Sequence, residues 1–125
     1  MARLFIRIDF DEATSFGPGK VRIFEMIDKC GSITRAATSL QLSYAHAWKL
    51  IEATEHTFGA PLIMTTTGGA NGGGAVLTEL DRTVVARYRE IERRAAHATA
   101  DMLEEMGEMV SSRRSRASKS QVAVE

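Results

Sequence analysis

Residues 29–51 carry positive charge without an opposing carboxylate, and this charge could contact an anionic partner. The whole chain carries 16 Lys and Arg against 16 Asp and Glu, yet this stretch contains Lys29, Arg35 and Lys49 and no carboxylate. Basic side chains bind phosphate groups, and hydroxyl side chains and backbone N–H groups can hydrogen-bond to them. The local charge therefore favours a nucleic-acid partner more than the balanced total does.

A helix predicted over 44–58 would present this chemistry on one face. Ser43 is a good N-cap, and Gly59 with Pro61 ends the helix. Steps of 100° per residue place a core face on one side, formed by Ala47, Trp48, Leu50 and Ile51. The free face then holds Ala45, His46, Lys49, Ala53 and His56. Such a helix suits a major groove, because its N-terminal N–H groups attract phosphate. A plain core-packing helix of a three-helix domain is the alternative.

The stretch 68–74 has five glycines in seven residues and no charge. A hairpin tip of this composition buries nothing, so its use is close backbone approach to a ligand. A phosphate-binding loop would need a helix directly after the glycines, whereas a strand, Ala75-Val76-Leu77, follows here. Uncharged donors that could reach phosphates lie in and beside the tip, namely Thr65, Thr66, Thr67 and Asn71.

Catalytic and metal chemistry have little support in the sequence. His46, His56 and His97 are scattered, without a known ligand spacing. No nucleophile, base and orienting carboxylate can be grouped. Cys30 is the single cysteine, which excludes an internal disulfide and predicts a buried free thiol. We therefore expect no enzyme activity and no metal site.

The elements that position these residues follow from periodicity and caps. Alternation over 3–10 predicts a strand, and apolar spacing predicts a helix over 18–30 that ends at Gly31. Ser32 caps a short helix whose inward stripe is Ile33, Ala36, Ala37 and Leu40. A hairpin follows, with strands at 62–67 and 75–77. The predicted fold class is mainly α with a small β-wing (α+β), a winged helix-turn-helix.

A final helix is predicted over about 78–110, capped by Thr78 with Glu79 and Asp81 in its first turn. Apolar residues recur along it at steps of three and four. This seam consists of Leu80, Val84, Tyr88, Ile91, Ala95, Ala98, Met102, Met106 and Met109. A helix of about 48 Å exceeds what the domain can cover, so its far half needs a partner. Residues 1–110 would form one domain, and 111–125 a disordered basic tail.

Residues 16–91 resemble the N-terminal winged-helix domain of ModE-type molybdate-responsive transcription regulators, which is related to that of LysR-type regulators. The resemblance starts with Gly31-Ser32-Ile33 and Ala36-Ala37 and continues through Leu42-Ser43-Tyr44-x-x-Ala47-Trp48. It then follows the glycine-rich stretch through Gly74-Ala75-Val76-Leu77-Thr78 and reaches Tyr88. The combination of Ser-Tyr-x-x-Ala-Trp with a glycine-rich wing is specific among helix-turn-helix regulators.

The resemblance implies a homodimer on a palindromic double-stranded DNA operator, with the recognition helix in the major groove and the wing beside it. The DNA-binding residues would be Arg35, Ser43, Tyr44, Ala45, His46, Lys49, Thr65, Thr66, Thr67 and Asn71. The dimer interface would be Val84, Tyr88, Ile91, Ala95, Ala98 and Met102. This chain departs from the pattern by having Ala45-His46 where a basic residue is frequent, and no basic residue in the wing.

The molybdate-binding modules of full-length ModE regulators have no counterpart in 111–125, so the chain resembles shorter members with the DNA-binding domain alone. We expect no cofactor in this chain, although molybdate is possible by resemblance. The expected function is transcription regulation, for example of molybdate transport or molybdoenzyme genes. The alternatives are a protein-interaction module that does not bind DNA, or a stand-alone oxyanion sensor. Without an apolar run of membrane-spanning length or a secretory segment, we expect a cytoplasmic protein that does not contact a membrane.

Overall fold

The computed structural model describes residues 2–66 and 73–124, the stretch 118–124 by its backbone alone. Its elements, in chain order, are β1 (Ile8–Asp9), β2 (Ser15–Phe16), α1 (Pro18–Cys30), α2 (Ile33–Ser39), α3 (Tyr44–Phe58), β3 (Ile63–Thr66), β4 (Gly74–Leu77) and α4 (Glu79–Val124). The predicted fold class, mainly α with a small β-wing, is confirmed. Two compact units divide the chain: Phe5–Glu90, and Met1–Leu4 with Ile91–Glu125.

Local capping signals set the bounds of the first three helices. Helix α1 ends at Gly31, whose φ of 69° suits glycine. Ser32 caps α2 by accepting a hydrogen bond from the Arg35 N–H, and Ser43 caps α3 by accepting one from the His46 N–H. In the turn between α2 and α3, Gln41 takes a left-handed conformation with φ 59°. The predicted helix starts and ends over 18–58 are therefore confirmed.

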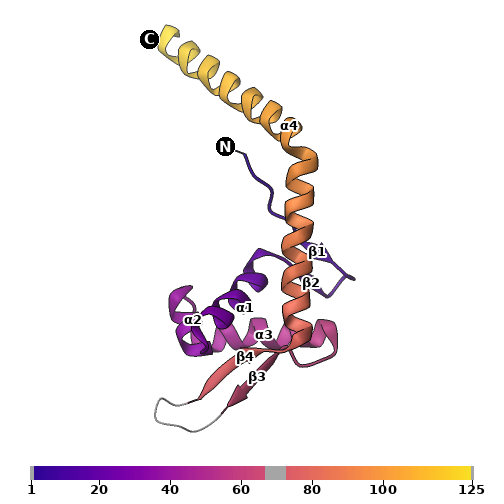
Figure 1. Cartoon of the computed structure of the whole chain (residues 1–125). Helices are drawn as coiled ribbons and strands as arrows, with labels where there is room; N and C mark the ends of the chain where they lie inside the picture. Colours follow the sequence, from indigo (N-terminus) through magenta and orange to yellow (C-terminus); the bar gives the residue numbers. More distant parts are fainter. Residues whose placement is uncertain (1, 67–72, 125) are drawn as a thin grey trace. The chain divides into compact units, whose positions relative to one another are not determined.

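The core lies where α1, α2, α3, the hairpin β3–β4 and the start of α4 meet (Figure 1). Its buried apolar side chains are Phe16, Val21, Ile23, Phe24, Ile27, Ile33, Ala36, Ala37, Ala47, Ile51, Leu62, Ile63, Ala75, Leu77 and Tyr88. The small side chains of Ala36 and Ala37 allow α2 to approach its neighbours closely. Only Thr54 and Asp81 are buried polar residues in the described part of the chain.

The hairpin β3–β4 is antiparallel, with Ile63 opposite Leu77 and Thr66 opposite Gly74. Burial alternates in β4, where Ala75 and Leu77 are buried and Val76 is exposed, whereas in β3 only Ile63 is buried. On the exposed face the cross-strand pair Met64 and Val76 is 55% and 47% exposed. The hairpin is as predicted, whereas the residues between its strands lie outside the described residues.

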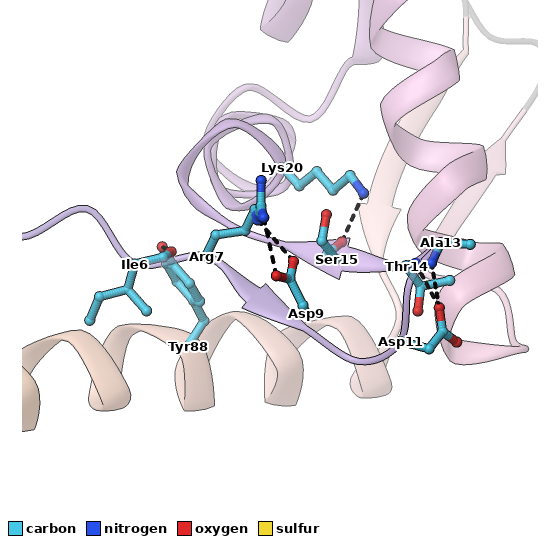
Figure 2. Close-up of polar contacts among 9 residues, drawn as sticks. All are labelled: Ile6, Arg7, Asp9, Asp11, Ala13, Thr14, Ser15, Lys20 and Tyr88. Atoms are coloured by element: carbon cyan, nitrogen blue, oxygen red, sulfur yellow. Dashed lines mark hydrogen bonds and ion pairs between the residues drawn. The ribbon is translucent and has the colours of Figure 1, made fainter.

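The strand predicted over 3–10 is shorter than expected, because only Ile8–Asp9 pairs with another strand. The chain reverses at Asp11, whose Oδ1 accepts hydrogen bonds from the N–H groups of Ala13 and Thr14, both at 2.8 Å (Figure 2). This tight turn leaves a two-residue partner, β2, before α1 begins. The prediction of residues 3–7 and Phe10 as strand is wrong, since no strand pairs with them in the part of the chain that the structure describes.

Helix α4 starts as predicted, where the Thr78 hydroxyl accepts a hydrogen bond from the Asp81 N–H at 3.3 Å. It does not end near residue 110 but continues to Val124, so the expected disordered tail is corrected to helix. The reason lies in the composition, since residues 111–124 contain neither proline nor glycine and include the helix formers alanine, arginine and lysine. None of the helices, over the residues described, is apolar over a length that would cross a membrane.

Candidate nucleic-acid interface

The N-terminal turns of α3 present the predicted recognition residues to solvent. Tyr44 is 53% exposed, and Ser43, Ala45, His46 and Lys49 are also exposed. The opposite face buries Ala47, Ile51 and Thr54 at positions i, i+4 and i+7. The helix is thus anchored by one face and leaves the other free, as the sequence predicts.

The core face of α3 differs from the prediction at one edge. Trp48 and Leu50 are half-buried and lie beside the core, while Thr54 takes a buried position and donates its hydroxyl hydrogen to the Leu50 carbonyl at 2.7 Å. The Trp48 ring meets the exposed Tyr44 ring edge-on, with centroids 6.3 Å apart. Trp48 therefore connects the core to the recognition face, because it is one turn from Tyr44 and on the same side of the helix.

The three basic residues of the stretch 29–51 have no ion-pair partner within the described part of the chain. They are Lys29 at the end of α1, Arg35 in α2 and Lys49 in α3, all exposed. Their charge is not neutralised locally, which favours approach of a polyanion. The predicted cluster of positive charge is thus accessible, although its three members come from three different helices.

The hairpin brings Thr65 and Thr66 to the surface next to the Gly-rich stretch. The Thr66 hydroxyl accepts a hydrogen bond from the Gly74 N–H at 3.1 Å, across the last pair of the ladder. A side chain at Gly74 would crowd this contact, since a Cβ there would lie 3.2 Å from Thr66 Oγ1. The other two predicted wing residues, Thr67 and Asn71, lie outside the described residues.

Glu55 connects α3 to the hairpin, a role that was not predicted from the sequence. Its Oε2 accepts hydrogen bonds from the backbone N–H groups of Leu62 at 2.8 Å and Ile63 at 3.4 Å. Thr78 directly follows β4 and donates its backbone N–H to the Leu62 carbonyl and its hydroxyl hydrogen to the Pro61 carbonyl. A carboxylate near a helix C-terminus is unfavourable for the helix dipole, and this was the available signal that Glu55 has another role.

Asp81 was predicted as a helix-dipole residue, but the structure also buries its side chain. Both carboxylate oxygens are buried and have no hydrogen-bond partner in the described chain. Burial raises the pKa of Asp81 to about 7, with help from the nearby charges of Glu55 and Asp28 and against that of Arg82. Arg82 itself pairs with Asp28 at 3.1 Å.

The predicted dimer seam divides into two parts. Tyr88 is 2% exposed and donates its hydroxyl hydrogen to the Ile6 carbonyl at 2.6 Å (Figure 2). Its ring also packs edge-on against Phe16. Its assignment to a dimer interface is therefore corrected, since the chain's own N-terminal segment and β2 cover it. Val84 is half-buried against the same core. Ile91, Ala98 and Met102 are exposed and Ala95 is half-exposed, so these four side chains are accessible to a partner chain.

Proteins of known family or structure resemble this chain over the helices and hairpin described above. Residues 19–80 match the family described as bacterial regulatory helix-turn-helix protein, lysR family. The chain is 39% identical over 85 residues to the Molybdenum transport protein ModE of Azotobacter vinelandii, covering 68% of this chain and 32% of that protein. It is 36% identical over 95 residues to the Transcriptional regulator ModE of Haemophilus influenzae, covering 76% and 37%.

Among solved structures, the DNA-binding domain of CbnR in complex with DNA has the same fold. It matches with a TM-score of 0.52 and 19% identity, over 67% of this chain and 91% of that one. This likeness concerns the fold alone. The chain spans about a third of the length of the ModE relatives that it matches.

Proposed function

We propose that the protein is a sequence-specific DNA-binding transcription regulator, because residues 19–80 match the lysR family of bacterial regulatory helix-turn-helix proteins and the chain is similar to a ModE protein. The observation that carries this is the free face of α3, where a capped helix N-terminus coincides with exposed Tyr44, His46 and Lys49. In the major groove, Lys49 would bind phosphate or a guanine edge and His46 would read a base. Such a regulator acts on DNA in the cytoplasm.

The proposal includes a homodimer on a palindromic operator. Two-fold symmetry would repeat the α3 face for a second half-site, and the exposed apolar residues of α4 supply a surface for the pairing. The target genes would concern molybdate uptake or molybdoenzymes, since two relatives are named for molybdenum transport or for regulation as ModE. DNA binding itself needs no cofactor in this proposal, and equilibrium dialysis with molybdate tests direct binding of the oxyanion.

Fluorescence anisotropy with a DNA duplex taken from the region upstream of the gene that encodes this chain tests the proposed function. We expect tighter binding than to a scrambled duplex, with affinity that falls as salt rises, because phosphate contacts release counterions. Lys49→Ala should weaken binding and lower the salt slope by about 1. Arg87→Ala, which removes an exposed cation from α4, is the matched control and should bind like the wild type.

Two results would contradict the proposal. One is equal affinity for the upstream and scrambled duplexes at every salt concentration. The other is an equal loss for Lys49→Ala and Arg87→Ala, which would mean that the charge of the chain as a whole, and not the α3 face, determines binding. The His46→Ala variant adds a finer test, because it should change the preferred sequence more than the overall affinity.

A further inference from the structure

A surface hollow on α1 lies outside the α3 face that is proposed to contact DNA, and it shares only Lys29 with the unpaired basic residues described above. It has a volume of about 290 Å³ and is formed by residues of α1 and α4 and by Leu40, the residue that follows α2. Its lining residues are Arg22, Glu25, Met26, Lys29, Leu40 and Arg89. All of them lie in the unit Phe5–Glu90.

The charge of this hollow is unbalanced. Glu25, its one carboxylate, is bound by Arg89 through two hydrogen bonds of 2.9 and 2.5 Å. Arg22 and Lys29 lie about one helical turn to either side of Glu25, are exposed, and have no partner in the described chain. Their seven-residue spacing puts them about 10 Å apart along one face of α1.

The floor between these two cations is apolar. Met26 and Leu40 are half-buried and pack against the core, so they are fixed in place and still reach the surface. An occupant that complements this hollow would offer two carboxylates about two helical turns apart and apolar side chains beside them.

A segment with that pattern lies in the same chain. Residues 95–112 contain no Lys or Arg, and their carboxylates are Asp101, Glu104, Glu105 and Glu108. Asp101 and Glu108 have the same seven-residue spacing as Arg22 and Lys29. At 100° per residue, the acidic stripe adjoins a methionine stripe whose members, Met102, Met106 and Met109, are 60%, 62% and 52% exposed.

We propose that the acidic, methionine-rich segment 101–109 of a second copy of this chain docks in the hollow between Arg22 and Lys29. This rests on the homodimer of the proposed function and names the contact that stabilises it. Two-fold symmetry would form the contact twice in each dimer. The flexible methionines would adapt to the floor of Met26 and Leu40, and the carboxylates would neutralise the two free cations.

Charge reversal in full-length chains tests the docking. One variant is Arg22→Glu with Lys29→Glu, and the other is Asp101→Lys with Glu108→Lys; all four residues are exposed, so both variants should fold. Sedimentation equilibrium should give dimers at least tenfold weaker for each variant alone. An equimolar mixture of the two should recover association near the wild-type level, because both contacts of the mixed dimer are again attractive.

The controls separate this docking from the proposed function. Arg35→Glu with Lys49→Glu should abolish DNA binding and leave the dimer dissociation constant unchanged. A wild-type dimer that is insensitive to both reversals overturns the docking alone, whereas a wild-type monomer overturns the homodimer as well. Failure of the mixture to associate, together with recovery in a single chain that carries all four substitutions, would show docking within one chain and would also overturn the proposal.

Discussion

Residues 5–90 and residues 91–117 differ in what their side chains contact. The first region contains every buried side chain in the described residues, and its helices are bounded by Ser32, Ser43 and Gly59. The second region is one stretch of helix in which no side chain is buried. The first region is therefore stabilised by its own packing, whereas the second region has exposed methionines and no buried side chain of its own.

The largest effect that tests this contrast is the loss of a core side chain. Phe24→Ala should lower the free energy of unfolding by about 3–5 kcal/mol, because Phe24 is completely buried. Met106→Ala removes a side chain that is 62% exposed and should change it by less than about 0.5 kcal/mol. Urea unfolding below the dimer dissociation constant measures both, and equal losses would mean that residues 91–117 are packed within the chain itself.

The buried carboxylate of Asp81 should make the first region depend on pH. Its pKa rises from 3.8 to about 7 on folding, so the folded state binds the proton more tightly. The contribution of Asp81 to stability is then greatest below pH 4, falls as the pH rises to about 7, and is constant above that, with a total loss of up to about 4 kcal/mol. Asp81→Asn should remove this dependence and be more stable than the wild type at pH 8 in urea unfolding.

Asp11→Asn serves as a control of opposite sign. Hydrogen bonds lower the pKa of the exposed Asp11 carboxyl, and the bond from Ala13 has the largest effect, followed by those from Thr14. Its contribution is present above the ordinary pKa and is lost as the pH falls, so this variant should lose stability at neutral pH instead of gaining it. A gain at pH 8 for both variants would point to net charge as the cause rather than to burial of Asp81.

Truncation at Glu92 tests whether the second region serves association. The shortened chain should stay folded and sediment as a monomer. Its affinity for a duplex with two half-sites should fall about 100-fold, while its affinity for a single half-site should be unchanged, because only the linked binding is lost. Sedimentation and anisotropy measure these effects, and a truncated chain that is still dimeric would contradict the assignment.

The smallest expected effect concerns the boundary between core and surface. Trp48→Ala should lower the free energy of unfolding by about 1–2 kcal/mol, less than full burial would give, since Trp48 is half-buried. Tyr44→Ala, at an exposed position, should cost less than about 0.5 kcal/mol and weaken DNA binding. A loss above about 3 kcal/mol for Trp48→Ala would place it in the core, as the helical pattern predicts.

Helix bounds and the hairpin were predictable from the sequence because their signals are local. A cap such as Ser43 and a glycine such as Gly59 act within one turn of the residues they stabilise. The free face of α3 also followed from spacing, since Ala47 and Ile51 fix which side is buried. These features depend on neighbours within a few positions of the chain.

The remaining features depend on contacts between distant residues. Glu55 accepts a hydrogen bond from Leu62, seven residues later and directly before β3, and Tyr88 donates one to Ile6, 82 residues away. Periodicity placed Tyr88 on the apolar face of its helix but could not indicate which segment covers that face. The continuation of α4 past residue 110 shows a further limit, because a polar, charged composition is compatible with either coil or helix.

The three attachments of the hairpin base have a consequence for the thermodynamics of recognition. The backbone N–H of Ala75 donates to the Gly31 carbonyl at 2.9 Å, and Glu55 accepts from the N–H groups of Leu62 and Ile63. Thr78 donates to the carbonyls of Pro61 and Leu62. The hairpin base and α3 are thus set in one arrangement before any ligand arrives. DNA binding would therefore cost little conformational entropy at the hairpin base. Substitution of a residue at this base would increase the dissociation rate of the DNA complex even though that residue does not itself contact DNA.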